Sequence, residues 1–437
     1  MASGLHRYYV LAVLTLVYTL NFMDQNLLLL LLQPIKVELQ LSDTQLGFVS
    51  GPAFGILYAL MGLPFARWAD RGSRTNIAAV AVALWGVMVM ACFFVTRMSH
   101  LVLARIAAAV GAAGCMPPTY SLVGDYFPRP AERARAMTVY MSASSIASLF
   151  SLIVGGWLNE LLGWRVALVV IGLPGLAAAV LVRATIKDPT RASGAAASET
   201  RAGPSPLLAM VGVWNLGAFR HLALALILLY TMGSGLAPWY AAFIMRTYAI
   251  DTGELGVWLG LIFGLGGIAG TLFGGYVAGK WFPRDERAQM RMIAILIIAV
   301  VPCLYLFLFA PGKRQALFAL VGVMVLFNSF FGPTFALLQR LVPNDLRATT
   351  LAAVMLAANL IGMGVGPQVV GALSDALSSV FRGESLRYAM MSFSLLGFWA
   401  AHHLWAIGRT VSRDLGTGVA ADGLGKAHLV NGASGAQ

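Results

Sequence analysis

The chain has 437 residues, of which 59% are hydrophobic and 11% are charged, and its mean hydropathy is +0.78. Soluble globular proteins carry about 25% charged residues, so this composition excludes a soluble globular protein. Glycines and prolines scattered through apolar runs exclude a disordered or collagen-like chain. Apolar stretches of about 20 residues recur, which is the length an α-helix needs to cross a bilayer core. The sequence therefore predicts an all-α polytopic membrane protein.

The formal net charge is +12, with 30 Lys and Arg against 18 Asp and Glu. This charge does not indicate a nucleic-acid-binding protein, because the basic residues occupy short loops and form no soluble basic domain. The three cysteines, Cys92, Cys115 and Cys303, lie singly inside apolar runs, which indicates packing and neither a disulfide nor a metal site. We expect no metal, no cofactor and no nucleic-acid partner.

Twelve apolar stretches fall into two sets of six. The first set covers residues 9–32, 44–65, 76–95, 101–123, 138–158 and 164–186. The second set covers residues 221–245, 255–279, 292–309, 317–341, 350–373 and 388–407. The segment between the sets is rich in Ala, Gly, Ser and Pro, as solvated linkers are. We predict a six-helix bundle over 1–187, a cytoplasmic linker over 188–218, a second six-helix bundle over 219–410 and a disordered cytoplasmic tail over 411–437.

Lys and Arg are unevenly distributed between the two sides of these spans. With the N-terminus inside, 21 of them lie on the cytoplasmic side and 8 on the outer side, while Arg105 falls within a span. Loops retained in the cytoplasm carry an excess of Lys and Arg. The sequence therefore predicts a multi-pass protein of the inner (plasma) membrane, with both termini cytoplasmic.

The two sets of spans share a short sequence echo. Phe-Pro at 127–128 is followed by Arg135, and Val-Pro at 342–343 is followed by Arg347, in each case after the fourth span of its set. Such a duplication is the parallel repeat of major facilitator transporters, whose substrate site lies between the halves near the bilayer midplane. We therefore predict the major facilitator fold, with 12 transmembrane helices in two six-helix bundles.

The loop after the second span contains Asp70, Arg71 and Arg74. It resembles the loop motif of major facilitator transporters, in which Gly-x-Leu-Ala-Asp-Arg precedes a further glycine and basic residues. A carboxylate here can face the N-terminal dipole of a neighbouring helix, and the arginines can pair with an acid at a helix end such as Asp125. The alternative is a basic loop that only sets topology. The predicted gating residues are Asp70, Arg71, Arg74, Asp125, Arg135 and Arg347.

Two charged residues remain inside the spans, Asp24 in the first and Arg105 in the fourth. A charge near the bilayer midplane costs about 2.5–3.5 kcal/mol, so such residues are functional candidates. Burial favours the protonated form of a carboxyl group, and we predict that Asp24 couples transport to protons; the alternative is a structural acid bonded to neighbouring helices. Arg105 offers fixed donors for a carboxylate or phosphate, or for an acid; the alternative is snorkelling to the interface.

Polar and aromatic side chains at helical spacing indicate a binding cavity. Tyr18, Asn21 and Gln25 lie on the same face of the first span as Asp24. We expect this stripe of side chains to line the central cavity. We further expect Pro238 to break the seventh span, and Gly362 and Gly366 to allow close helix packing. For each aromatic residue, packing in the core is the alternative. The predicted substrate-binding residues are Tyr18, Asn21, Gln25, Arg105, Tyr120, Trp239, Tyr240, Asn328, Phe335 and Asn359.

From about residue 8 to residue 409, the chain resembles the Spinster-like branch of the major facilitator transporters, and specifically its bacterial members. The most specific segments include Asn21-Phe-Met-Asp24, residues 35–47, Gly124-Asp-Tyr-Phe-Pro128 and Gly364-Val-Gly-Pro367. Two positions depart from the branch, because Gln25 replaces its usual Arg and Ala112 replaces its usual Glu. The resemblance implies a proton-coupling set that is reduced to Asp24, with Arg105 retained.

These observations predict a secondary active transporter that moves an amphipathic organic anion, lipid-like or aromatic, by alternating access with proton coupling through Asp24. The alternative is an uncoupled facilitator of a similar substrate, since Gln25 and Ala112 remove two charges. A membrane receptor or enzyme is a remote alternative, and the sequence holds no paired carboxylates, His-x-x-x-His or phosphate loop that would mark an enzyme. Expected partners are a small amphipathic or anionic substrate and the lipid bilayer, and the chain is expected to be a monomer.

Overall fold

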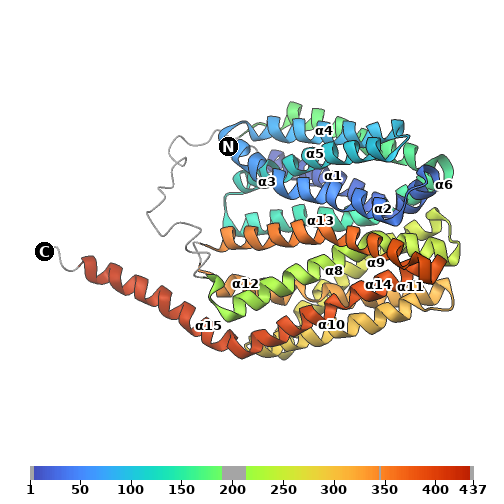
Figure 1. Cartoon of the computed structure of the whole chain (residues 1–437). Helices are drawn as coiled ribbons and strands as arrows, with labels where there is room; N and C mark the ends of the chain where they lie inside the picture. Colours follow the sequence, from blue (N-terminus) through green and yellow to red (C-terminus); the bar gives the residue numbers. More distant parts are fainter. Residues whose placement is uncertain (1–3, 189–212, 344–345, 434–437) are drawn as a thin grey trace.

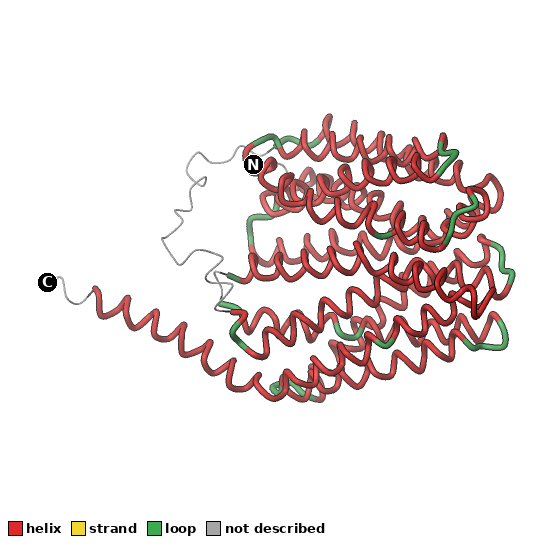
Figure 2. The backbone as a smooth tube through the Cα atoms, viewed as in Figure 1, coloured by secondary structure: helices red, strands yellow, loops and turns green. Residues whose placement is uncertain are grey.

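The computed structural model describes residues 4–188, 213–343 and 346–433, without the side chains of Leu63, Asp70, Ala348 and residues 416–433. These residues form helices joined by short loops, and none of them forms a strand (Figure 2). Two helical bundles, one from each half of the sequence, lie side by side (Figure 1). The predicted all-α major facilitator fold is confirmed.

The first half begins with one long helix and ends with a kinked one. Its helices are α1 (Gly4–Leu39), α2 (Asp43–Ser50), α3 (Pro52–Arg71), α4 (Arg74–Ala91), α5 (Met98–Tyr126) and α6 (Pro130–Thr185). Within α6, Gly163 has φ 81° and ψ 162°, a conformation that only glycine adopts readily. The chain reverses there, so the two arms of α6 are the predicted fifth and sixth spans.

The second half repeats this order. Its helices are α8 (Gly217–Tyr248), α9 (Thr252–Trp281), α10 (Glu286–Leu308), α11 (Lys313–Asn328), α12 (Phe331–Leu341), α13 (Arg347–Phe381), α14 (Ser385–Ser394) and α15 (Leu396–Ala433). Ten described stretches are long and apolar enough to cross a membrane. Two of them, residues 130–185 and 349–415, each contain two predicted spans, so all twelve spans are accounted for.

Two expectations about local structure differ from the structure. Helix α8 runs unbroken through Pro238, because α13 packs closely against it there; Trp239 Nε1 donates to the carbonyl of Pro367 at 3.3 Å. The tail expected to be disordered from residue 411 continues α15 to Ala433. No proline interrupts it, and the Asp414 carboxylate accepts the backbone N–H of Ala218 at 2.8 Å. Most of the predicted linker, residues 189–212, lies outside the described residues.

At two helix crossings between the halves, glycines bring the helix backbones into close contact. A Cβ at Gly47 of α2 would lie 2.6 Å from the carbonyl oxygen of Pro367 in α13, and one at Gly256 of α9 would lie 2.2 Å from that of Leu152 in α6. Small residues allow such approach of helix backbones in membranes. Within the second half, the close packing predicted for Gly366 is confirmed, since a Cβ there would lie 2.8 Å from Gly235 Cα.

The bundle has two ends, which we name by what they carry. The start of α1 and the end of α15 lie toward the same end (Figure 1), which we call the terminal face; it also carries the loops at residues 72–73, 127–129 and 282–285. The opposite end carries the loops at residues 40–42 and 249–251 and the short 3-10 helix Arg382–Glu384. We call it the latch face, for the contacts described below.

Candidate functional site

The two charges inside the spans form a buried ion pair. Arg105 Nη1 of α5 lies 3.0 Å and 3.2 Å from the Asp24 carboxylate oxygens of α1, and the two residues are 4% and 1% exposed. Trp85 Nε1 of α4 donates to the same carboxylate at 3.4 Å. The Arg105 guanidinium also lies 4.4 Å from the ring centroid of Phe54, a cation–π contact. Three helices and a ring therefore hold this pair inside the first half.

Several polar atoms around this pair make no hydrogen bond with any described residue. They are Asn21 Nδ2 and Oδ1, Gln25 Nε2 and Arg105 Nε. Buried polar groups in folded proteins are nearly always paired, so exceptions require an explanation, such as strain, a catalytic role or a bound water or ion. The cluster of Asn21, Asp24, Gln25 and Arg105 is thus a polar centre in an apolar bundle, with hydrogen-bonding groups that other described residues do not satisfy.

The structure corrects the predicted placement of the first-span stripe. Tyr18, Asn21 and Asp24 are 5%, 1% and 1% exposed, so they face the interior of the first half and do not line an open cavity. Tyr18 stacks on Tyr140 with ring centroids 4.7 Å apart. The stripe turns inward because the counter-ion of Asp24 is in α5. For the same reason, Arg105 does not snorkel to an interface.

A separate aromatic pocket of about 290 Å³ lies between the halves. Asn26 and Leu29 of α1 line it on one side, and α8, α9, α10, α11 and α12 supply the rest. We name it the aromatic pocket, after Tyr230, Tyr240, Phe263, Phe327, Phe330 and Phe331 in its wall. No described charged side chain lines it, so it suits an apolar or aromatic group.

Two predicted substrate-binding residues, Tyr240 and Asn328, line the aromatic pocket. The side-chain Nδ2 of Asn328 donates to the Met324 carbonyl at 2.8 Å. The other candidates in the second half lie elsewhere: Phe335 stacks on Phe331 with centroids 6.1 Å apart, Trp239 is fully buried, and Asn359 is half-buried on α13. In the first half, Tyr120 is 49% exposed.

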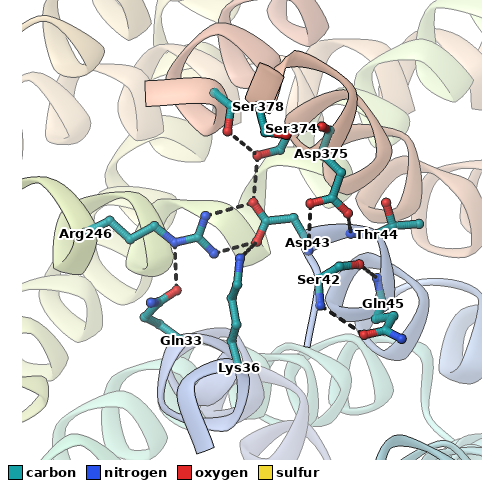
Figure 3. Close-up of polar contacts among 11 residues, drawn as sticks. Gln33, Lys36, Ser42, Asp43, Thr44, Gln45, Arg246, Ser374, Asp375 and Ser378 are labelled. Atoms are coloured by element: carbon teal, nitrogen blue, oxygen red, sulfur yellow. Dashed lines mark hydrogen bonds and ion pairs between the residues drawn. The ribbon is translucent and has the colours of Figure 1, made fainter. Parts of the chain in front are cut away.

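Asp43 at the start of α2 connects the two halves at the latch face (Figure 3). Its carboxylate accepts bonds from both terminal nitrogens of Arg246 in α8, at 2.7 Å and 2.8 Å. Lys36 Nζ lies 2.5 Å away, and the Ser374 hydroxyl of α13 donates at 2.6 Å. Asp43 is 3% exposed, and buried charge-assisted bonds are the strong ones. We call Lys36, Asp43, Arg246, Ser374 and Asp375 the Asp43 latch.

Two helix N-termini at this face are capped by an acid from the other half. Asp375 of α13 accepts the backbone N–H groups of Asp43 and Thr44 at 3.1 Å and 2.7 Å (Figure 3). Glu160 of α6 accepts the backbone N–H of Gly253 in α9 at 2.8 Å. A carboxylate at a helix N-terminus satisfies unpaired donors and the helix dipole. These caps and the Asp43 latch bond the two halves to each other at this face.

At the terminal face, the predicted gating residue Arg74 is a buried hub. It bonds Asp188 through its backbone N–H and guanidinium, at 2.6 Å and 2.8 Å, and the Ser121 hydroxyl at 2.9 Å. The pairing of a loop arginine with Asp125 is present. These contacts join α4, α5 and the end of α6 within the first half, so they bridge no described residue of the second half.

The other predicted gating residues make fewer contacts. Arg71 and Arg135 are exposed and form no ion pair with any described residue. Arg347 donates to the Val342 carbonyl at 3.2 Å. The Asp70 side chain lies outside the described part of the chain.

Replacing Arg74 with Ala is expected to lower stability by about 1–3 kcal/mol, because three hydrogen-bond acceptors lose their shared donor. The loss is moderated since Asp125 is 45% exposed and regains water. Thermal unfolding of the purified protein measures this effect. Arg71→Ala, at an exposed neighbouring position, serves as the control and should leave the melting temperature unchanged; an equal effect of the two replacements contradicts the hub.

Sequence reasoning missed the latch residues Asp43, Arg246, Ser374 and Asp375, as well as Glu160. One signal was available, because Ser42 and Gln45 form a capping box, which marks the start of a helix and places Asp43 in its first turn. Nothing in a single sequence indicates that Arg246, 203 positions later, reaches this helix start.

Comparison with known proteins agrees with this architecture. The model of the Major Facilitator Superfamily matches residues 14–367. An MFS-type efflux pump of Mycolicibacterium smegmatis is 34% identical over 87% of this chain and 87% of its own length. Protein spinster homolog 1 of Xenopus tropicalis is 24% identical over 90% of this chain and 78% of its own. A bacterial homolog of the human lysosomal transporter Spinster, solved in an inward-facing and unoccupied conformation, is 27% identical, with TM-score 0.83 over 94% of this chain and 99% of that one.

Proposed function

Because this chain belongs to the Major Facilitator Superfamily and is Spinster-like, we propose that it is a secondary active transporter of an amphipathic organic anion, coupled to protons through Asp24. The observation that carries the proposal is the aromatic pocket between the halves. It offers aromatic faces and two amides, from Asn26 and Asn328, to the apolar body of a solute. The relative named as an efflux pump favours export as the direction.

Helix α1 links the proposed coupling site to the pocket. Asp24 and Asn26 are two positions apart, so their side chains leave α1 on nearly opposite faces. Asp24 contacts Arg105 and Trp85 inside the first half, whereas Asn26 lines the aromatic pocket. A change in charge at Asp24 alters the packing of α1 on one side and is transmitted to the pocket on the other.

Proton binding at Asp24 supplies a physical route to coupling. The Asp24 carboxylate neutralises Arg105 at 3.0 Å, and a buried charge without a partner is costly. Protonation of Asp24 therefore breaks its pair with Arg105, and loss of the proton restores the pair, so each step changes the packing of α1, whose opposite face lines the aromatic pocket. In this scheme, proton binding at Asp24 and solute binding in the aromatic pocket are linked through α1.

The distribution of inter-half bonds supports an inward-facing conformation. The halves are bonded at the latch face, and the excess of Lys and Arg at the terminal face favours its placement in the cytoplasm. The Asp43 latch then closes the outer side. Alternating access requires that the latch opens when the terminal face closes.

A facilitator without proton coupling is the second candidate function. The observation that favours it is the pairing of Asp24 with a single counter-ion while Ala112, fully buried, offers no second acid. When Asp24 is protonated, Arg105 then has no second acid to pair with. The two candidates differ in whether a pH gradient drives accumulation.

The aromatic pocket is tested by ligand binding. A thermal-shift screen of lysophospholipids, aromatic carboxylates and hydrophobic dyes should identify ligands that raise the melting temperature. Phe331→Ala, which removes a ring stacked on Phe330 at 4.3 Å, should weaken binding of such a ligand by about tenfold, the effect expected of a buried aromatic contact. Phe318→Ala, at a position 64% exposed outside the pocket, is the control. Equal affinity of the Phe331 variant and the wild type contradicts the assignment.

A further inference from the structure

A second, polar pocket lies at the latch face and shares no lining residue with the aromatic pocket. It has a volume of about 230 Å³ and is enclosed by the end of α8 and the segment that leads into α14. Its lining includes Arg246, Thr247, Glu384 and Arg387. Thr247 and Glu384 are exposed, so the pocket opens to the solution at this face.

The pocket carries an excess of fixed positive charge. Two guanidinium groups line it, against the single carboxylate of Glu384, which bonds Arg387 Nη1 at 2.6 Å and is 54% exposed. The Arg387 guanidinium lies 5.9 Å from the ring centroid of Phe243 and 5.4 Å from that of Phe309. Cation–π contacts with two rings hold this side chain in place, so its remaining donors are preorganised for a ligand.

Arg246, the second cation, can exchange partners at low cost. It bonds Asp43 with both terminal nitrogens, but Asp43 also accepts from Lys36 at 2.5 Å and from Ser374 at 2.6 Å. If Arg246 turns to another anion, Asp43 keeps a cation and a hydroxyl and is not left as an unpaired buried charge. The usual penalty for breaking a buried ion pair is therefore reduced here.

We propose that this pocket binds a soluble oxyanion, a carboxylate or phosphate group, between Arg246 and Arg387. The planar forks of two arginines match the geometry of such groups. Because the bound anion and Asp43 compete for Arg246, occupancy weakens the bridge between the halves and favours opening of the latch face. By thermodynamic reciprocity, weakening the bridge strengthens anion binding.

Isothermal titration with inorganic phosphate, at constant ionic strength and on protein in detergent without phospholipid, tests the site without reference to transport. Wild type should bind phosphate saturably. Arg387→Gln should weaken it by about tenfold or more, since one charge-assisted set of bonds is lost, and Asp43→Asn should tighten it severalfold. Lys313→Gln is the control, because Lys313 pairs with Glu254 at the same face outside the pocket and should bind like wild type.

Three results overturn the proposal. Absence of saturable phosphate binding to wild type removes the site, and so does equal affinity of wild type and Arg387→Gln. If Arg387→Gln fails to fold, Arg387→Lys, which retains the charge, takes its place in this comparison. Unchanged affinity of Asp43→Asn removes the competition. Repeating the titration in phosphatidylglycerol nanodiscs distinguishes a soluble anion from a lipid headgroup, because loss of phosphate binding there assigns the site to lipid phosphate. Since no step involves flux, these outcomes are independent of the proposed transport function.

Discussion

Asp24→Asn and Arg105→Met are each expected to destabilise the protein by about 3–5 kcal/mol, because each leaves the buried charge of the other residue without its partner. Combining Asp24→Asn with Arg105→Met should recover most of that loss, since both charges are removed together. The coupling free energy in this double-mutant cycle is therefore large and favourable. Thermal or denaturant unfolding of the purified variants measures it.

The exposed pair Lys313 and Glu254 provides the control cycle. Their side chains are 42% and 45% exposed, and exposed ion pairs contribute about 0–1 kcal/mol. A coupling at Asp24 and Arg105 as small as at this surface pair would mean that the buried pair is not formed, and the account of the polar centre would be wrong.

Asp43→Asn is expected to shift the balance between the two conformations by about 30- to 150-fold away from the state with a closed latch face. The replacement weakens the bonds from Arg246 and Lys36 together, which lowers the free energy that favours the closed latch by about 2–3 kcal/mol. Each step of about 1.4 kcal/mol changes an equilibrium tenfold. Spin-label distances measure the shift, with labels at Val37 and Val380, which are 68% and 71% exposed near the latch.

A second label pair, at Ala134 and Lys280, reports on the terminal face, where both residues are exposed. For Asp43→Asn we expect a longer distance at the latch face and a shorter one at the terminal face. Lys313→Gln should leave both distributions as in wild type. If Asp43→Asn also leaves both unchanged, the latch does not govern the conformational balance.

The overall fold was largely predictable from sequence because each membrane-spanning helix requires an apolar stretch of about 20 residues, which is visible in the chain. Each of the twelve predicted spans is mostly helical, since a bilayer forces backbone groups to bond within each segment. The departures at Pro238 and after residue 411 arise from packing, through Pro367 against Trp239 and Asp414 against Ala218. Such contacts between distant segments leave no periodic trace in the chain.

The candidate site was only partly predictable. Asp24 and Arg105 stood out because a charge in an apolar span is rare, yet nothing in the spacing indicated that they bond each other and face inward. The latch was missed since Asp43 and Arg246 sit at span ends, where charges are ordinary. The aromatic pocket contains Phe327 and Tyr230, which are indistinguishable by sequence from core or lipid-facing aromatics.

Proton-driven accumulation tests the central claim most directly. Using a ligand identified in the thermal-shift screen, uptake into proteoliposomes is measured with and without an imposed pH gradient, for wild type and for the Asp24→Asn variant combined with Arg105→Met. We predict that wild type accumulates the ligand only with the gradient and that the double variant does not accumulate it under either condition. Equal final ligand levels in wild-type proteoliposomes with and without the gradient would contradict proton coupling through Asp24.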